Sequence, residues 1–572
     1  MKNLDARNVN SLWASAMVET WARCGLTHAV VSPGSRSTPL AVALAQHPKI
    51  DAIPVVDERS AAFFGLGMAR RSHSPVVLLC TSGSAGAHYL PAMIEAKETG
   101  VPLIAVTADR PPEMRDCASG QTIDQHRLFG AYANWYHELA VPELKKRQFE
   151  YLRQITRQAW SRASEVGPVH LNQPFRDPLP PQPDGGAAEA FFKTLPESFF
   201  AYPGCLEIER SRIRLKQQLT TQRGIIVAGP AMPEDPAGYA DHLLKLSGAT
   251  GWPILADALS PLRQHTPEGS AVVAGYDIIL RNPKVARDLT PRFVICLESW
   301  PTSKILRSWL EESQAEMLMI SERPGSRDAV QGRTREITAS PSSLEVETSS
   351  EPSRAYADQW MMAATRVETK LSRWMSSSAS AGFEGKATRE LSRLIPDNAN
   401  FVVASSMPVR DLEYFWPTSN RGIQVFASRG ANGIDGTLST AMGVAHVAEG
   451  PTILLTGDIA FLHDSNGLMS AREMDGALTV ILINNSGGRI FEHLPVAAFD
   501  PPFERFFATP PQVEFSKLCE AHGIAHRLLE SLADPSLQTE LTAPGMRIWE
   551  VRTDGKKDSA TRKRLLRDLA RD

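Results

Sequence analysis

The sequence predicts an α/β protein built from three doubly wound parallel-sheet domains. Short apolar runs of strand length alternate with amphipathic helical stretches, and this alternation restarts three times along the 572 residues. The loop Asp177–Gly186, rich in Pro and Gly, separates the first series from the second. The segment Thr338–Ser353, rich in Ser, Thr, Glu and Pro, is expected to form a domain-edge strand and a linker before the third. We therefore expect domains at 1–185, 186–355 and 356–572.

Each predicted domain contains apolar runs that we expect to form strands. In the first domain the loops after these runs carry most of the polar motifs, whereas no run of the middle domain leads into a phosphate-binding glycine pattern. The expected strands are Ala29–Val31, Ile53–Val56, Val76–Cys80 and Leu103–Thr107, then Ile225–Ala228, Ile254–Ala256 and Phe293–Cys296, and finally Phe401–Ala404, Thr452–Thr456 and Leu478–Ile483.

The composition, with 42% hydrophobic and 22% charged residues, is that of a large globular protein. A net charge of −3 disfavours a surface for nucleic-acid backbones. The N-terminus has no continuous apolar stretch and no run reaches the length of a membrane span, so we expect a cytoplasmic protein. The six cysteines lack CxxC spacing, which favours buried reduced thiols over disulfides or zinc sites. They are Cys24, Cys80, Cys117, Cys205, Cys296 and Cys519.

In the third domain, an Asp and an Asn follow two of the expected strands. Asp458 comes after the second of these strands and Asn485 after the third, with Asp464–Gly476 expected to form a helical crossover between them. Their side chains and the backbone carbonyl of Gly487 are hard oxygen donors, which suit Mg²⁺ holding a diphosphate. The alternative is an ordinary strand–turn pair with an Asp helix cap.

These residues resemble the diphosphate-anchoring signature of thiamin-diphosphate enzymes. Near the other end of the chain, Asp57-Glu58-Arg59 follows a strand and precedes the small-residue helix Ser60–Gly67, and Glu58 matches the Glu that bonds N1′ of the aminopyrimidine ring in those enzymes. The motifs SPGSRS, TSGSAG and ADRPPE are similar to those of the 2-succinyl-5-enolpyruvyl-6-hydroxy-3-cyclohexene-1-carboxylate (SEPHCHC) synthases of menaquinone biosynthesis.

The resemblance implies a transferase that decarboxylates 2-oxoglutarate on thiamin diphosphate and adds the succinyl carbanion equivalent to isochorismate by 1,4-addition. It also implies Mg²⁺ or Mn²⁺, and a homodimer or dimer of dimers with active sites at the chain interface. Another thiamin-diphosphate-dependent 2-oxoacid decarboxylase or carboligase remains an alternative. A non-catalytic protein on a decayed fold is disfavoured, because Glu58, Asp458 and Asn485 are all intact.

Several residues are implied as cofactor contacts. Glu58 would share a proton with N1′, which requires a partly desolvated carboxyl group, although it could instead be a helix cap or first-turn acid. Met407 matches the bulky apolar residue that bends the cofactor, although a core methionine is the alternative. The other implied cofactor contacts are Ser82, Gly83, Asp458, Ile459, Asn485, Gly487 and Ile490.

Both implied substrates are dianions, for which Arg is better suited than Lys. Four arginines lie in loops directly after strands and match substrate positions of the family, although each alone could be a surface residue: Arg36, Arg110, Arg410 and Arg429. The resemblance adds Ser35, Gln121 and Ser406 as polar contacts, and Ile490, Phe491 and Leu494 as an apolar wall in the helix after the metal loop.

This sequence departs from the family pattern at two places. Gly120 stands where the family often has Asn, and Ser303-Lys304 stands where a Lys-Arg pair is expected, which leaves Lys304 as the remaining cation. Elsewhere, Ser428–Gly436 is a glycine-rich turn before the small-residue helix Thr437–Ala445, and we expect its glycines to permit close approach of a ligand.

Overall fold

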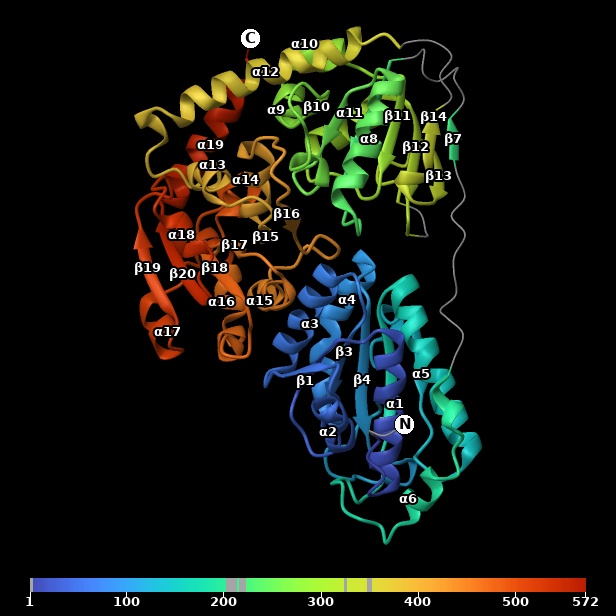
Figure 1. Cartoon of the computed structure of the whole chain (residues 1–572). Helices are drawn as coiled ribbons and strands as arrows, with labels where there is room; N and C mark the ends of the chain where they lie inside the picture. The colour runs from blue at the N-terminus through green and yellow to red at the C-terminus, as the bar shows by residue number, and fades with distance from the viewer. Residues whose placement is uncertain (1–3, 202–212, 216–222, 324–326, 347–351, 572) are drawn as a thin grey trace. The chain divides into compact units, whose positions relative to one another are not determined.

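The computed structural model describes residues 4–201, 213–215, 223–323, 327–346 and 352–571 (Figure 1). The chain forms two compact units. The first unit comprises Met1–Glu207 with Ser428–Glu449 and His463–Gly476, and the second comprises Ile208–Ala427, Gly450–Leu462 and Ala477–Asp572. The domain boundaries expected from composition stay a prediction.

Three six-stranded parallel sheets carry the fold, one within each of the three residue ranges predicted as domains. The first sheet runs, in spatial order, β2 (Asp51–Pro54), β1 (His28–Val31), β3 (Val76–Cys80), β4 (Leu103–Asp109), β6 (Val169–Pro174) and β5 (Trp135–Glu138). The middle sheet runs β10 (Val272–Val273), β9 (Ile254–Ala256), β8 (Gly224–Ala228), β11 (Phe293–Leu297), β12 (Glu316–Ser321) and β13 (Arg333–Thr338). The last sheet runs β16 (Gln424–Phe426), β15 (Asn400–Val403), β17 (Thr452–Gly457), β18 (Ala477–Asn484), β20 (Gly545–Arg552) and β19 (Ala525–Leu529).

The predicted strands are present with small shifts of their ends. The largest shift is in β2, which ends at Pro54 and leaves Val56 exposed. This edge strand pairs only with β1, and the pairing stops where Val31 lies opposite Pro54. In the segment Thr338–Ser353, Thr338 is the last residue of β13, and a short strand β14 (Leu344–Val346) pairs with β7 (Ile213–Leu215). The expected linker lies partly outside the described residues.

Helices cover both faces of the first sheet. Val77 and Leu79 of β3 share one apolar core with α1 (Val9–Cys24), α2 (Thr38–Gln46) and α5 (Lys146–Val166). Leu78 points the other way and packs against Gly65 of α3 (Glu58–Ser72). Adjacent side chains of a strand point to opposite faces of the sheet. When helices cover both faces, all side chains of the strand are therefore buried, and its sequence is a continuous apolar run. Other helices of this region are η1 (Gly83–Tyr89), α4 (Leu90–Thr99) and α6 (Ala187–Phe192).

The small residues of α3 serve helix packing. In the first unit α3 packs against α15 (Thr437–Val447), and a Cβ at Gly67 would lie 2.0 Å from the Thr440 carbonyl oxygen. A Cβ at Gly443 would lie 1.9 Å from the carbonyl oxygen of Phe64. Glycine thus lets the two backbones approach closely. Gly436, expected to admit a ligand, instead faces the Phe63 ring.

The second unit contains the middle and last sheets. One face of the middle sheet shares a core with α8 (Pro236–Thr250), and the other shares a core with α9 (Tyr276–Leu280), α10 (Pro283–Asp288), α11 (Lys304–Ser313), α12 (Ala355–Met375) and α19 (Gly555–Ala570). A face of the last sheet packs on α13 (Glu384–Leu394), α14 (Met407–Phe415) and α18 (Leu537–Leu541). Further α-helices of the last domain range are α16 (Asp458–His463) and α17 (Phe515–Ala521).

The first and last sheets share one strand topology, and this decides where a ligand can bind. In each, the second strand lies on one side of the first strand and the third strand lies on its other side. The side on which strands are added therefore reverses between β1 and β3 and between β15 and β17. Ligands of open parallel sheets bind at the carboxyl ends of strands beside such a switch point. The loops after β1, β3, β15 and β17 are therefore the natural places for functional residues.

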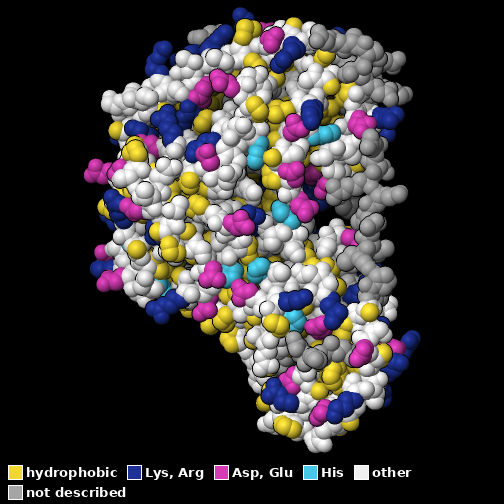
Figure 2. Space-filling view, viewed as in Figure 1, with side chains coloured by type: hydrophobic (Ala, Val, Ile, Leu, Met, Phe, Trp, Pro, Cys, Tyr) yellow, Lys and Arg dark blue, Asp and Glu magenta, His cyan; other side chains and the backbone are white. Residues whose placement is uncertain are grey.

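Acidic and basic side chains are interspersed over the described part of the face shown in Figure 2. No helix among the described residues combines the length and apolarity that crossing a membrane requires. The described cysteines form no disulfide with one another. Cys117 is exposed, contrary to the expectation of burial, because it lies in an irregular loop, and Cys205 lies outside the described residues.

Candidate cofactor and substrate site

The loops after β17 and β18 meet at one edge of the last sheet. The two strands pair in parallel up to Gly457 opposite Ile483. Asp458 is the first residue of α16 (Asp458–His463), so the crossover begins earlier than expected and continues as the short 3₁₀ helix η8 (Ser465–Ser470). The Asp458 carboxylate accepts a hydrogen bond from the Gly487 N–H at 2.8 Å and one from the Ile459 N–H at 2.7 Å.

The donor set in these loops is suited to a divalent cation. Asp458 is 1% exposed, and burial raises its pKa to about 6, an effect to which the nearby Glu384 charge adds. A cation beside this carboxylate would favour the charged form. The Asn485 Nδ2 donates to Glu384 at 2.7 Å, which directs the amide oxygen away from that carboxylate. The Gly487 carbonyl accepts one hydrogen bond, from the Arg489 N–H at 2.8 Å, and keeps a second lone pair.

Gly487 has a backbone conformation that only glycine adopts without strain. Its φ is 115°, and a Cβ there would lie 2.1 Å from the Ala508 carbonyl oxygen. The turn therefore needs glycine to bring its carbonyl into the loop. Carboxylate, amide and carbonyl oxygens together are the ligands that Mg²⁺ and Mn²⁺ prefer.

The loop after β15 lies at the switch point of the same sheet. Ser406 has φ 72°, an uncommon conformation for a non-glycine residue, and it directly precedes α14. Met407 is the first residue of that helix and is 5% exposed. Arg410 donates to the Ser406 carbonyl at 2.5 Å, and burial lowers the pKa of its guanidinium. A partly buried cation of this kind favours an anionic ligand.

Glu58 lies in the first unit, in the first turn of the helix that follows the edge strand β2. It is the first residue of α3, but the helix cap is Asp57, whose side chain accepts from the Ser60 N–H. The side chain of Glu58 is half-buried and has no hydrogen-bond partner among the described residues. Burial raises the pKa of the Cys80 thiol, and the Glu58 charge adds to this effect, which places Glu58 beside the end of β3.

The loop after β3 gathers several predicted residues. Ser82 and Gly83 are buried at the start of η1. Gln121 donates to the Ser82 carbonyl at 3.0 Å, and the Arg110 guanidinium donates to the Ser82 hydroxyl. The Gly83 N–H donates to the buried side chain of Gln125 at 2.9 Å. Gln125 was missed from sequence, because no strand or motif marks it.

Arg36 and Arg110 form a pair of like charges near this loop. Arg36 is 7% exposed, donates to the Phe175 carbonyl at 2.9 Å and lies 3.7 Å from the Asp177 carboxylate. Burial lowers the pKa of Arg110, and the charge of Arg36 lowers it further. Two guanidiniums held close together favour a dianionic ligand. Ser35 is exposed beside them.

Arg429 lies in a loop of the first unit, and a buried ion pair fixes the position of this loop. Glu95 accepts from the N–H groups of Gly430 at 3.1 Å and Ala431 at 2.8 Å, and Arg70 donates to Glu95 at 2.8 Å. Arg70 and Glu95 are 1% and 3% exposed. This support was not predicted, because Glu95 is far from the loop in sequence.

Lys304 and the predicted apolar wall lie in the second unit. Lys304 is exposed at the start of α11, and Ser303 caps that helix and donates to Asp277, which gives the Ser a local structural role. Phe491 lies in a 3₁₀ helix, η9 (Arg489–His493), and its ring is 5.6 Å from that of Phe507. Ile490 is half-buried in η9, and Leu494 follows it, 43% exposed.

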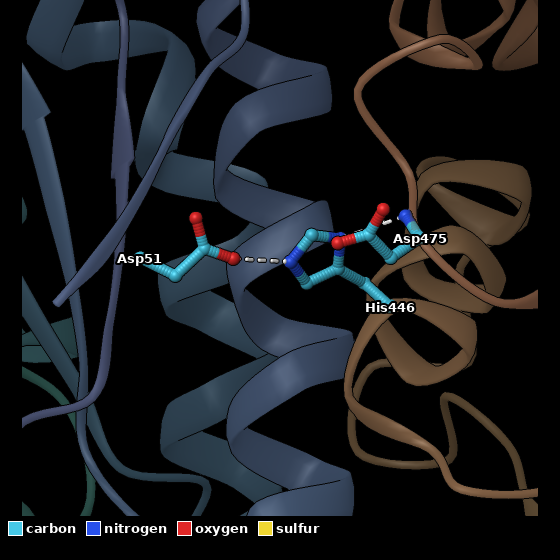
Figure 3. A group of neighbouring side chains, drawn as sticks. All are labelled: Asp51, His446 and Asp475. Atoms are coloured by element: carbon cyan, nitrogen blue, oxygen red, sulfur yellow. Dashed lines mark hydrogen bonds and ion pairs between the residues drawn. The ribbon is translucent and has the colours of Figure 1, made fainter. Parts of the chain in front are cut away.

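One other group of side chains in the first unit has the spacing of metal ligands. Asp51, His446 and Asp475 lie together, as Figure 3 shows. However, the His446 Nε2 is 2.8 Å from the Asp51 carboxylate and its Nδ1 accepts from the Asp475 N–H at 3.1 Å. With both ring nitrogens engaged, the histidine links β2 to α15 rather than offering a ligand atom.

Family models of thiamine pyrophosphate enzymes match most of the chain. The N-terminal TPP binding domain matches residues 13–128, the middle domain 207–403, and the C-terminal TPP binding domain 410–542. A solved structure from Mycobacterium smegmatis, described as a thiamin diphosphate-dependent enzyme, has a TM-score of 0.64 at 16% identity, over 95% of this chain and 99% of that one. This likeness shows the fold.

Curated relatives extend the match over the full length. Proteins of Synechococcus elongatus and Acaryochloris marina, each named 2-succinyl-5-enolpyruvyl-6-hydroxy-3-cyclohexene-1-carboxylate synthase, are both 44% identical over 99% of this chain and over 97% and 99% of their own lengths. The Trichodesmium erythraeum protein of the same name is 43% identical over 98% of both chains. This chain therefore belongs to the SEPHCHC synthase family of thiamine pyrophosphate enzymes.

Proposed function

We propose that this chain joins 2-oxoglutarate to isochorismate by 1,4-addition, forming SEPHCHC and releasing CO₂ in menaquinone biosynthesis. The observation that carries the proposal is the full-length identity to synthases of that name. The arginines that follow the strands β1, β4 and β15 support it, because both substrates carry two carboxylates.

The residues present fit thiamin diphosphate and a divalent cation. When bound, the cofactor would supply the nucleophilic carbon that attacks the oxoacid. Asp458, Asn485 and Gly487 would hold Mg²⁺ or Mn²⁺ against the diphosphate. Glu58, half-buried and unpaired among the described residues, would exchange a proton with N1′ of the pyrimidine ring. The further proposed cofactor contacts are Ser82, Gly83, Met407, Ile459 and Ile490.

The substrate contacts divide between the two units. Arg410 shares α14 with Met407, so we assign it, with Ser406, to 2-oxoglutarate. Arg36 and Arg110 lie together in the first unit and are assigned to isochorismate. The remaining contacts proposed for isochorismate are Ser35, Gln121 and Arg429, and Lys304 is proposed as a substrate contact without a partner assigned to it. The residues proposed for the apolar wall that excludes water are Ile490, Phe491 and Leu494.

We further propose three domains, at 1–185, 186–355 and 356–572, which bind the pyrimidine, connect, and bind the diphosphate, respectively. Each range contains its own six-stranded sheet, which supports this division. We also propose a homodimer or dimer of dimers in which each active site takes Glu58 from one chain and Asp458 from another.

The direct test supplies pure protein with 2-oxoglutarate, isochorismate, thiamin diphosphate and Mg²⁺ and follows the coupled adduct by mass spectrometry. We expect CO₂ release and the adduct together. Release of CO₂ without adduct would favour another 2-oxoacid decarboxylase or carboligase, and the lack of both would contradict the proposal.

Removing the charged metal ligand should weaken cofactor binding. In Asp458→Ala we expect at least a roughly tenfold loss of thiamin-diphosphate affinity, since a buried carboxylate ligand is lost. Calorimetry of both proteins with and without Mg²⁺ measures this. Chelation should have the same effect on the native enzyme, and added Mg²⁺ should reverse it. Unchanged affinity in the variant would rule out Asp458 as a ligand.

Replacement of each arginine should impair the binding of mainly one substrate. Arg410→Ala should raise KM chiefly for 2-oxoglutarate and Arg36→Ala chiefly for isochorismate. Each increase should correspond to about 2 kcal/mol of lost binding free energy, which is at the low end for a lost charge pair because other cations remain. Steady-state kinetics with each substrate varied in turn separates the two effects. Equal impairment of both substrates by both variants would overturn the division.

A further inference from the structure

We infer that Glu384 is a positioning residue for the cation: it turns the Asn485 amide so that its oxygen, not its nitrogen, faces the metal. The inference rests on the cation site of the proposed function. Glu384 is the first residue of α13 and lies 101 positions before Asn485 in sequence.

The contact between the two side chains has only one chemically sensible orientation. The Asn485 Nδ2 donates to the Glu384 Oε2 at 2.7 Å, and the two residues are 6% and 3% exposed. An ionised carboxylate can only accept hydrogen bonds, so it must pair with the NH₂ end of the amide. The carbonyl end, which alone can bind a hard cation, is thereby directed elsewhere.

A buried guanidinium is paired with Glu384. Arg562 of α19, 2% exposed, donates to the Glu384 Oε1 at 2.6 Å and to Asp411 at 2.6 Å. Arginine stays protonated in proteins, so it keeps a permanent positive charge beside both carboxylates. Each oxygen of Glu384 therefore has its own donor, one from Arg562 and one from Asn485.

The same network joins the metal loop to the helix that carries two predicted site residues. Asp411 lies in α14, next to Arg410 and four residues after Met407. Through Arg562, the position of α14 is coupled to that of Asn485.

The test replaces Glu384 by Gln, which has one acceptor oxygen for two donors. Mg²⁺ is titrated in the presence of thiamin diphosphate, by calorimetry and by tryptophan fluorescence. We expect a roughly tenfold to hundredfold loss of Mg²⁺ affinity, the range for residues that orient metal ligands. Turnover should recover at saturating Mg²⁺, so the half-saturating Mg²⁺ concentration should shift far more than kcat.

The matched control is Glu390→Gln in the same helix. Glu390 accepts from Ser531 and from the Leu532 N–H, away from the metal loop. Its variant should keep native Mg²⁺ affinity. If Glu384→Gln does not fold, Glu384→Asp replaces it, because the shortened carboxylate keeps its charge beside Arg562 but cannot reach Asn485, and the same loss is expected.

A double-mutant cycle with Asn485→Asp separates positioning from general stability. A carboxylate at position 485 offers an oxygen in either orientation, so it does not need Glu384 to orient it. In that background Glu384→Gln should therefore lower the Mg²⁺ affinity little or not at all. An equal loss in both backgrounds would overturn the inference, as would an Mg²⁺ affinity of Glu384→Gln within about twofold of native. Loss of Mg²⁺ binding in Asp458→Ala but not in Glu384→Gln would refute this inference alone, whereas native binding in Asp458→Ala would refute the cation site itself.

Discussion

Replacing Glu58 by Gln is expected to lower turnover by about a hundredfold or more while thiamin diphosphate still binds. Gln keeps the volume of the side chain but cannot exchange a proton with N1′, and general acid–base catalysis of this kind contributes about 10²–10⁴-fold. The diphosphate end is held by other residues, so cofactor affinity should change little. Single-turnover measurement of CO₂ release, together with calorimetry of cofactor binding, distinguishes the two effects.

The structure makes a trivial explanation of such a loss easy to exclude. Glu58 has no hydrogen-bond partner among the described residues, and the cap of α3 is Asp57. The interaction that the substitution would remove is that of the Glu58 charge with the helix dipole, worth about 0.3–1 kcal/mol of folding free energy. The thermal midpoint should therefore fall only slightly. Glu19→Gln, which breaks an ion pair with Arg23 and weakens a contact with His47 far from the proposed site residues in sequence, serves as the control and should keep full activity. Near-native turnover in Glu58→Gln would remove Glu58 from the mechanism.

The positions of the functional loops could be predicted from sequence because parallel strands impose them. Asp458 and Asn485 follow apolar runs, and neighbouring parallel strands bring their carboxyl ends to one edge. The same reasoning holds for Ser82 after β3 and Ser406 after β15. A strand of this kind is visible in sequence because both its faces are buried.

The supporting residues could not be predicted, because their partners are distant in sequence. Glu384 lies in an amphipathic helix and Arg562 lies 178 positions after it, so each reads as a surface charge until the fold places them together. Glu95 and the loop of Arg429 are another such case. Polar edge strands were missed for a related reason: β13, with the sequence RTREIT, is mostly exposed and has no apolar alternation.

The replacement of the expected Lys-Arg pair has a local explanation in the structure. Ser303 caps α11 and donates to Asp277, a role that a lysine side chain could not fill. Lys304 remains exposed one position later. At this departure from the family pattern, the serine thus makes two local hydrogen bonds, which a comparison of motifs alone does not reveal.

A mixture of Glu58→Gln and Asp458→Ala is expected to recover about a quarter of native activity when the chains are co-expressed and assayed at a cofactor concentration that loads native sites but not Asp458→Ala sites. The reason is the proposed sharing of each site between chains. In a dimer of Glu58→Gln with Asp458→Ala, one site would carry both lesions and the other neither. Random pairing makes about half of the dimers mixed, each with one intact site of two, whereas either parent alone has only damaged sites.

The matched control pairs two lesions from the same half of the proposed site, Asp458→Ala with Asn485→Ala. Every site of that mixed dimer would then carry one lesion, so activity should stay at the level of the parents. Different affinity tags on the two chains allow the mixed species to be purified and assayed, and co-expression avoids reliance on exchange across an obligate interface. If the purified Glu58→Gln and Asp458→Ala pair were as inactive as its control, each site would have to be built within a single chain, and the proposed role of the dimer would be wrong even with the catalytic residues correctly assigned.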